Sequence, residues 1–242
     1  MSLFDKLREA VRSERPVALA MVVAGPNIGA KLLVDPTSSS IGSLGSVELD
    51  ATVRDDALRL LDAEQNETRS YSAGDGTVDI LIESYPAPPH LIIVGAVHTA
   101  IPLTTAAKLL GFRVSVVDPR TTFATPERFP DADALIAEWP DEALPKLRLD
   151  RSTYVVVLTH DPKFDDPAVR VALAHPVRYV GALGSQRTQA RRRTALLEAG
   201  VDERELERIF GPVGLPIGAK TPAELAISIL AEIVAVRRGK RP

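Results

Sequence analysis

The apolar residues in the N-terminal third of the chain follow both helical and strand-like patterns. Helical spacing occurs over residues 4–11 and 47–61. Short apolar runs predict strands at residues 17–23, 31–34 and 78–82. Residues 35–45 are rich in Ser and Gly and are expected to form a loop. This region is therefore expected to be a small α+β unit.

From residue 91 onward the apolar runs are short, lack polar alternation and are separated by segments long enough for a helix. Strands are predicted at residues 91–94, 114–117, 135–136 and 154–158, and from Tyr179. Helices are predicted up to Leu110 and over residues 167–174, where Asp166 would be the N-cap. Strands of this kind are typical of a parallel sheet covered on both faces. The fold class is predicted to be α/β, with a doubly wound parallel sheet in the C-terminal part.

The last predicted helix has a clear start signal. Thr221 stands at the N-cap, Pro222 at the first helical position and Glu224 two residues later, which is a capping box. An apolar stripe on this helix should pack on the sheet. It consists of Ile229, Leu230, Ile233 and Val234.

Three prolines within residues 86–89 can neither continue a helix nor pair inside a sheet. They predict a stiff connector. The expected organisation is an N-terminal α+β domain over residues 1–85, a connector over 86–89, and a second domain over 90–242.

Composition narrows the function classes. The chain has 242 residues, a formal net charge of −3 and no cysteine. The charge argues against a nucleic-acid binder, and no apolar run is long enough to span a bilayer. The absence of cysteine removes disulfides, thiolate metal sites and cysteine nucleophiles, and it suits a cytoplasmic protein.

The turn after residue 94 is the first candidate site. Residues 95–100 read G-A-V-H-T-A, so of the dinucleotide fingerprint only Gly95 and the final small residue are present. Val97 occupies the position where glycine lets the backbone approach a phosphate, which disfavours NAD(P). Asp118 stands where a carboxylate would hold a ribose, and His98 lies in the turn. The alternative is a plain βαβ turn in which Asp118 caps or forms a salt bridge.

The loop after residue 158 is the second candidate. Thr159, His160, Asp161 and Lys163 follow the strongest predicted strand, where such folds place ligand contacts. They could hydrogen-bond a polar heterocycle or transfer protons. Turn formation and capping of the next helix are the alternative.

The third candidate follows the strand that begins at Tyr179. Gly184 and Ser185 lead into a helix with Arg187 in its first turn, where the helix dipole favours acidic residues. A bound anion would account for that arginine. Arg192 and Arg193 are interpreted as lying on a solvated helix face.

Other chemistry is less well supported. The four histidines show no metal-ligand spacing, so no metal site is expected. Ser46, Glu48 and His160 are the candidate catalytic residues, but no base adjacent to Ser46 is identifiable from the sequence. The favoured alternative makes Ser46 a helix N-cap.

Taken together, these segments resemble the XdhC/CoxI family, the accessory factors of xanthine dehydrogenase and related molybdenum hydroxylases. The resemblance covers most of residues 90–239, and shorter matches lie in the N-terminal part. The matching segments are 91–118, 159–165, 179–185, 211–219, 221–224, 28–31, 42–48 and 82–86.

Membership implies a Rossmann-like C-terminal domain and a role in handling the molybdenum cofactor, molybdopterin. It also implies an apo molybdenum hydroxylase and a sulfur-donating desulfurase as partners. The chain departs from the family pattern at four positions: Ser46 replaces a cysteine, Val97 a glycine, Phe210 a histidine and Pro216 an aspartate. Serine cannot form a thiolate, so direct sulfur handling by this chain is not expected.

The leading hypothesis is a cofactor-binding accessory protein rather than a turnover enzyme. Gly184, Ser185 and Arg187 would hold a phosphate, the loop at 159–163 would face the ring, and the N-terminal loop at 45–48 would close over the cleft. Two alternatives stay open: an NAD(P)-dependent oxidoreductase, and a non-catalytic adaptor that has lost its ligand. A homodimer is the favoured assembly.

Overall fold

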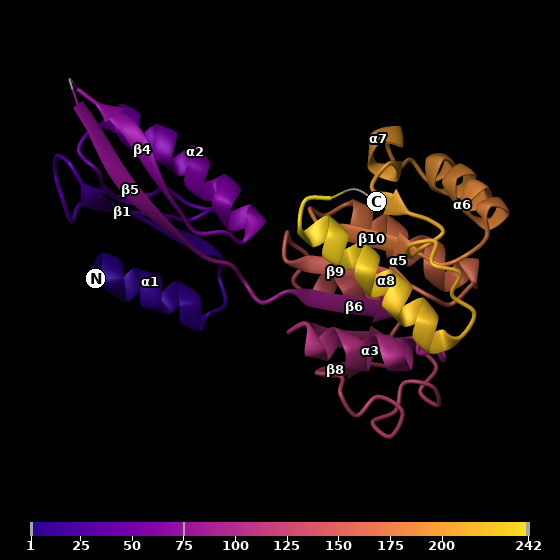
Figure 1. The fold of residues 1–242 in the computed structure, drawn as a ribbon. Coiled ribbons are helices and arrows are strands. Elements are labelled where there is room, and N and C mark those ends of the chain that lie inside the picture. Colours follow the sequence, from indigo (N-terminus) through magenta and orange to yellow (C-terminus); the bar gives the residue numbers. More distant parts are fainter. Residues whose placement is uncertain (1, 75, 241–242) are drawn as a thin grey trace. The chain divides into compact units, whose positions relative to one another are not determined.

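The computed structural model describes residues 2–74 and 76–240. They form two compact units, Met1–Ala87 and Pro88–Pro242 (Figure 1). Each unit has its own sheet and its own hydrophobic core. Residues 86–89, between the last strand of one unit and the first strand of the other, lie outside any helix or strand.

The N-terminal unit has an antiparallel sheet with a helix on each face. Its strands lie in the order β3-β2-β1-β5-β4. Its elements are α1 (Leu3–Arg12), β1 (Val17–Ala24), β2 (Lys31–Val34), β3 (Ile41–Ser43), α2 (Val47–Ala63), β4 (Glu67–Ala73) and β5 (Gly76–Tyr85). Alternate residues of β1 face opposite sides of the sheet, because successive strand side chains point in opposite directions. Ala18 and Ala20 pack toward α2, whereas Val17 and Leu19 pack toward α1.

The structure corrects two predictions in this unit. Residues 35–45 are not all loop, because Ile41–Ser43 pairs with Lys31–Leu33 as the edge strand β3. The strand predicted at 78–82 is longer and forms a hairpin with β4, which the sequence did not predict. No residue of β4 is fully buried, so this edge strand is held by main-chain pairing and lacks the apolar run that marks a core strand.

The C-terminal unit has a parallel sheet with the strand order β11-β10-β9-β6-β7-β8. Its strands are β6 (His90–Val94), β7 (Arg113–Val117), β8 (Ala134–Ile136), β9 (Thr153–Val157), β10 (Tyr179–Ala182) and β11 (Ile209–Phe210). Its helices are α3 (Ala100–Leu109), α4 (Pro140–Ala143), the 3-10 turn η1 (Leu144–Lys146), α5 (Pro162–Leu173), α6 (Gln186–Glu198), α7 (Glu203–Leu206) and α8 (Pro222–Arg237). Read from β8, the order is that of a doubly wound nucleotide-binding fold, with its topological switch point between β6 and β9. The predicted α/β fold class is confirmed.

Both faces of this sheet are covered. Leu91 and Ile93 of β6 lie in one core with α3 and α8, which run side by side (Figure 1). Ile92 and Val94 lie in the opposite core with α5 and α6. Burial on both faces accounts for strands without polar alternation. No helix in the described part of the chain has the length and apolar character needed to cross a bilayer.

The capping box of the last helix is confirmed, because Thr221 accepts from Glu224 N and the Glu224 carboxylate accepts from Thr221 N. The stripe prediction is wrong for Val234, which is 36% exposed. The start predicted for α5 is also wrong. The helix begins at Pro162 with Asp161 as its N-cap, so Asp166 is not the cap and Pro167 lies inside the helix.

Candidate functional site

The turns after β6 and β9 meet at the switch point of the parallel sheet. These two strands are neighbours, and their connections leave toward opposite faces. Gly95 has a φ of +105°, and a Cβ there would lie 2.5 Å from Thr159 Cγ2. Only glycine permits so close an approach in that conformation. The two turns therefore border the crevice where doubly wound folds bind ligands.

Asp118, directly after β7, is fully engaged within the protein. It is 1% exposed, and its Oδ2 accepts from Ala96 N at 2.8 Å and from Arg120 Nη2 at 2.7 Å. Its Oδ1 accepts from the main-chain N and the Nε of Arg120. Burial acts to raise the pKa of Asp118, but the hydrogen bonds from Arg120 and Ala96 outweigh burial and lower it. This geometry matches the salt-bridging alternative for Asp118. Both carboxylate oxygens already accept hydrogen bonds from the protein, so neither is free to accept one from a ribose hydroxyl.

Val97 packs its half-buried side chain against the core shared with α3 and α8. His98 lies in the same turn and is exposed. The donors to the Asp118 carboxylate come from Ala96 and Arg120, and not from Val97 or His98. The turn is thus held by Gly95, Ala96 and Asp118.

The loop after β9 folds back on its own side chains. Thr159 Oγ1 donates to the Asp165 carboxylate and accepts from Asp161 N at 3.1 Å. The Asp161 carboxylate accepts from Lys163 N at 3.0 Å and so caps α5. His160 has a φ of +63° and is exposed. Thr159 and Asp161 thus shape the loop, as in the turn-and-capping alternative.

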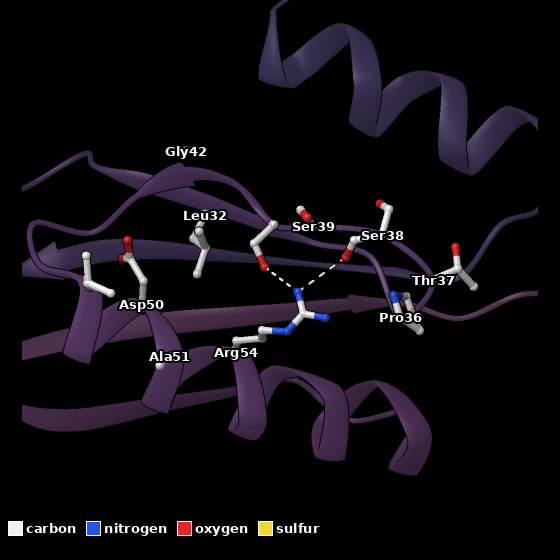
Figure 2. A pocket seen from close by; sticks show the side chains of 11 residues that line it. Leu32, Pro36, Thr37, Ser38, Ser39, Gly42, Asp50, Ala51 and Arg54 are labelled. Carbon is white, nitrogen blue, oxygen red and sulfur yellow. Dashed lines mark hydrogen bonds between the residues drawn. The ribbon is translucent and has the colours of Figure 1, made fainter.

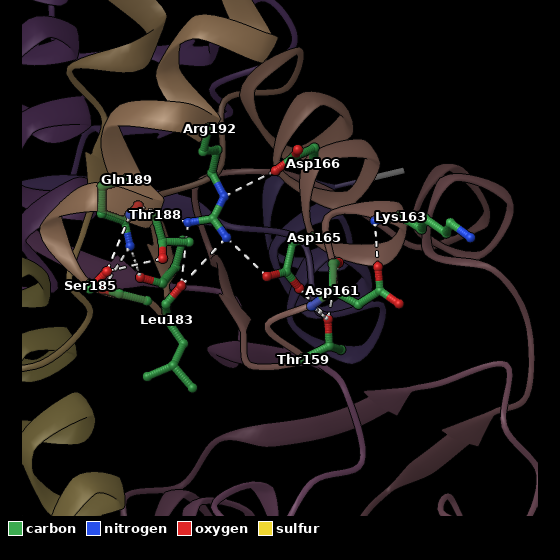
Figure 3. Close-up of polar contacts among 12 residues, drawn as sticks. Thr159, Asp161, Lys163, Asp165, Asp166, Leu183, Ser185, Thr188, Gln189 and Arg192 are labelled. Atoms are coloured by element: carbon green, nitrogen blue, oxygen red, sulfur yellow. Dashed lines mark hydrogen bonds and ion pairs between the residues drawn. The ribbon is translucent and has the colours of Figure 1, made fainter.

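The centre of this region is Arg192, on α6 (Figure 3). Its side chain is 2% exposed, so the prediction that it lies on a solvated face is wrong. Nη2 contacts Asp165 Oδ2 at 2.9 Å, and Nε contacts Asp166 Oδ1 at 3.2 Å (Figure 3). Nη1 donates to Gln189 Oε1 at 2.7 Å, and both Nη atoms lie 3.4 Å from the Leu183 carbonyl oxygen. Arg193, in contrast, is exposed and pairs with Glu203, as the prediction required.

Arg192 joins the loops after β9 and β10. Asp165 and Asp166 belong to the first turns of α5, whereas Leu183 precedes α6. Burial raises the pKa of the Asp165 carboxyl, against the hydrogen bond from Thr159 and the guanidinium of Arg192. A charge buried in this way is tolerated when paired and hydrogen-bonded. The arginine therefore fixes the position of the α6 N-terminus relative to the α5 N-terminus.

The N-terminus of α6 carries the third group of predicted residues. Ser185 Oγ accepts from Thr188 N at 3.3 Å and caps the helix. Gly184 has a φ of +132°, and its ideal Cβ would lie 2.8 Å from Thr188 Cγ2. Arg187 is exposed and makes no hydrogen bond or ion pair with the described residues. The first turn contains no acidic residue, so the positive end of the helix is not neutralised.

Lys163 is exposed, and its side chain points away from Arg192 (Figure 3). Within residues 2–74 and 76–240 no group of three or more His, Cys, Asp or Glu side chains could hold a metal ion. The structure therefore brings Gly95, Thr159 and Asp161 together, and it leaves His98, His160 and Lys163 at the surface.

In the N-terminal unit, Ser46 caps α2 by accepting from Leu49 N at 3.2 Å, which is the predicted cap alternative. Hydrogen bonds from its own backbone and from Ser46 lower the pKa of the exposed Glu48, which makes it a poorer base. That this loop closes over the cleft stays a prediction.

The N-terminal unit also has a hollow of about 670 Å³ beside a serine-rich loop (Figure 2). Arg54 Nη1 donates to Ser40 Oγ at 2.7 Å and lies 3.4 Å from the Ser38 carbonyl oxygen. No predicted site residue lines this hollow.

Arg192 was not among the predicted site residues. One signal for it was present, because Leu196 lies four residues further on and is buried. Residues at i and i+4 share a helix face. The apolar Leu196 therefore marked the buried face of α6, on which Arg192 also lies.

Comparison with protein-family models gives a match to the XdhC Rossmann domain over residues 91–233. A second model, of the XdhC and CoxI family, matches residues 10–72. The chain belongs to the XdhC family. The predicted resemblance is confirmed, and the switch-point crevice described above lies within the XdhC Rossmann domain.

Three relatives share this similarity. The uncharacterized protein YqeB of Escherichia coli K12 is 29% identical over 98% of this chain and 46% of its own length. A probable xanthine dehydrogenase subunit of Bacillus subtilis 168 is 34% identical, over 68% of this chain and 48% of its own. The molybdenum cofactor insertion chaperone PaoD of E. coli K12 is 38% identical, over 37% of this chain and 28% of its own. The chain thus spans less than half the length of these relatives.

A solved structure described as a xanthine dehydrogenase from Bacillus halodurans has the same fold. It matches with a TM-score of 0.57 and 22% identity, covering 100% of this chain and 97% of that one.

Proposed function

We propose that this XdhC-family chain is an accessory factor in the maturation of a molybdenum hydroxylase. In this role it binds the molybdenum cofactor, a phosphorylated pterin, at the carboxyl edge of its parallel sheet. The similarity to a protein named as a molybdenum cofactor insertion chaperone supports this role. A carrier needs to bind and protect its ligand, so no catalytic group is required.

One structural observation carries the proposal. The N-terminus of α6 lies beside the switch-point loops, is held there by the buried Arg192, and presents the exposed Arg187. Oriented main-chain N–H groups and a guanidinium together form a setting for a phosphate. Gly184, Ser185 and Arg187 would hold that phosphate, and Thr159, His160, Asp161 and Lys163 border the ring.

The oxidoreductase alternative is weaker. A nicotinamide dinucleotide requires a carboxylate for the ribose, and both oxygens of Asp118 already accept from Ala96 and Arg120.

The test is thermal unfolding of the purified chain with molybdopterin under anaerobic conditions. Binding to the folded state alone adds about 2.7 kcal/mol of stability at a ligand concentration of 100 times Kd. The Arg187→Ala variant should lose that stabilisation. Arg191→Ala is the matched control, because Arg191 is exposed on the same helix one turn further from its N-terminus.

An unchanged unfolding temperature of the wild-type chain with molybdopterin would reject the binding role. Equal losses in the two arginine variants would reject the phosphate site at the helix N-terminus. Stabilisation by NAD(H) or NADP(H) instead would favour the oxidoreductase. Mass spectrometry of small molecules released from the denatured protein tests the ligand class independently.

The apo-hydroxylase is the proposed partner, and co-purification with it is the corresponding measurement. Contact with a sulfur-donating desulfurase, a homodimeric state and a cytoplasmic location stay predictions.

A further inference from the structure

Four flat side chains form a continuous row at the carboxyl edge of the parallel sheet. In order along the row they are Phe123, Arg120, Phe164 and Trp139. The guanidinium carbon of Arg120 lies 4.5 Å from the Phe123 ring centroid and 5.5 Å from that of Phe164. The rings of Phe164 and Trp139 stack with centroids 4.8 Å apart and an interplanar angle of 20°.

The strand order explains why these residues meet. Arg120 and Phe123 follow β7, Trp139 follows β8, and Phe164 lies in the first turn of α5 after β9. The strands are parallel, so their carboxyl ends lie at one edge of the sheet. That edge also carries the switch-point crevice of the proposed cofactor site.

Ion pairs of buried aspartates hold two members of the row in place. Asp118 accepts from Nε and Nη2 of Arg120, which fixes the plane of the guanidinium. Phe164 is followed by Asp165, which Arg192 anchors. Side chains fixed in this way lose little conformational entropy when a ligand stacks on them.

The two ends of the row differ. The Phe123 ring has a second guanidinium near it, that of Arg128 at 5.5 Å, and is 41% exposed. Trp139 is 43% exposed, and within the described part of the chain Phe164 is its one stacking partner. The open end of the row is therefore the indole.

We infer that Trp139, backed by Phe164 and Arg120, is a stacking platform for the planar heterocycle of the ligand, the pterin ring. This inference rests on the proposed function, since it places the ring of the cofactor whose phosphate the α6 N-terminus holds. Indole surfaces stack on planar rings, and each such stack commonly changes affinity by a measurable factor.

The platform can be tested directly because Trp139 is the only tryptophan in the chain. Tryptophan fluorescence of the full chain therefore comes from Trp139 alone. The probe is pterin-6-carboxylate, a stable oxidised pterin, and inorganic phosphate serves as the ring-free comparison. Quenching by the pterin, corrected against free N-acetyltryptophanamide, is the expected result, with no quenching by phosphate.

Binding of the same pterin is then measured by equilibrium dialysis. Trp139→Leu should weaken it by roughly 5- to 150-fold, the range found for single base–aromatic stacks. Trp139→Phe keeps an aromatic face and should stay within about threefold of wild type. Phe4→Leu removes an exposed ring from the N-terminal unit and is the matched control. Circular dichroism of each variant checks folding, and the wild-type quenching measurement does not depend on any variant.

The outcomes separate this inference from the proposed function. If molybdopterin stabilises the chain but Trp139→Leu binds pterin as wild type does, the platform is wrong and the accessory role stands. Quenching by phosphate equal to that by pterin also overturns ring stacking. A Trp139→Leu variant that loses an apo-hydroxylase but keeps pterin makes this surface a protein interface instead. Failure of both molybdopterin and pterin to bind overturns the two proposals together.

Discussion

Two buried aspartates at the carboxyl edge of the sheet are each paired with an arginine, and the pairs differ in reach, that is, in the sequence separation of the partners. Asp118 and Arg120 are two residues apart, and Arg120 remains 38% exposed. Asp165 and Arg192 are 27 residues apart, and both side chains are at most 2% exposed. The first pair shapes one turn, whereas the second ties two helices to each other. A buried pair of long reach is therefore expected to matter more for the fold than a local one.

Replacing Arg192 should have the largest effect. Arg192→Met leaves the Asp165 carboxylate buried without its cation, and removing one partner of such a pair costs about 3–5 kcal/mol. Denaturant unfolding measures the change. Arg193→Met, which breaks an exposed pair on the same helix, should cost at most about 1 kcal/mol.

A double variant sharpens this result. Adding Asp165→Asn to Arg192→Met removes the orphaned charge, so part of the lost free energy of unfolding should return. Additive losses in the double variant would show that the carboxylate was not the source of the cost.

Asp118→Ala should have a smaller effect, of about 1.5–3 kcal/mol, because it removes a charged acceptor from the Ala96 N–H. Arg120 can turn toward water once its partner is lost. Asp131→Ala is the control, an exposed carboxylate that accepts from Thr105 Oγ1. If Asp118→Ala cost as much as Arg192→Met, the reach of the ion pair would be irrelevant to stability.

His90, at the opposite end of β6, is a half-buried ionisable group whose neutral form is favoured. Burial, followed by the nearby Arg113, lowers the pKa of His90 to about 4 from its ordinary value of 6.5. Above pH 6.5 it is neutral in both the folded and unfolded states. Between pH 6.5 and 4 the unfolded chain binds a proton that the folded chain does not, so stability falls as pH falls.

At pH 5 this difference in pKa amounts to about 2 kcal/mol. His90 Nε2 shares a hydrogen bond of 2.8 Å with Ser115 Oγ, which a glutamine can also make. The free energy of unfolding of His90→Gln should therefore change less between about pH 7 and pH 5 than that of wild type. An unaltered pH dependence would mean that His90 ionises freely in the folded chain.

Features set by local sequence were predictable, whereas features that depend on distant partners were not. Five strands of the parallel sheet follow from apolar runs, whereas the two-residue edge strand β11 was not predicted. The start of α8 follows from three residues of local sequence. The start of α5 was ambiguous, since Asp161-Pro162 and Asp166-Pro167 are both suitable cap sequences. The structure uses the first, which places Asp165 inside the helix and facing Arg192.

The contacts of Arg192 and Trp139 could not be assigned from local sequence, although Leu196 marked the helix face on which Arg192 lies. An arginine followed by two more charged or polar residues is typical of a solvated helix face. Its burial becomes favourable through acidic partners on another helix, Asp165 and Asp166. Trp139 meets Phe164 because the ends of β8 and β9 lie on one sheet edge. Both contacts depend on strand order, which residue patterns do not specify.

The smallest predicted effect concerns the third group at this edge, the cap of α6. Ser185→Ala removes the acceptor for Thr188 N and should cost about 1 kcal/mol. Ser185→Gly should cost only a few tenths, because glycine is tolerated at an N-cap. In the proposed site Ser185 would hold the phosphate through its main-chain N–H, which glycine keeps, so molybdopterin should stabilise Ser185→Gly nearly as much as wild type. A complete loss of that stabilisation in Ser185→Gly, with the fold intact, would instead assign the serine hydroxyl to the ligand.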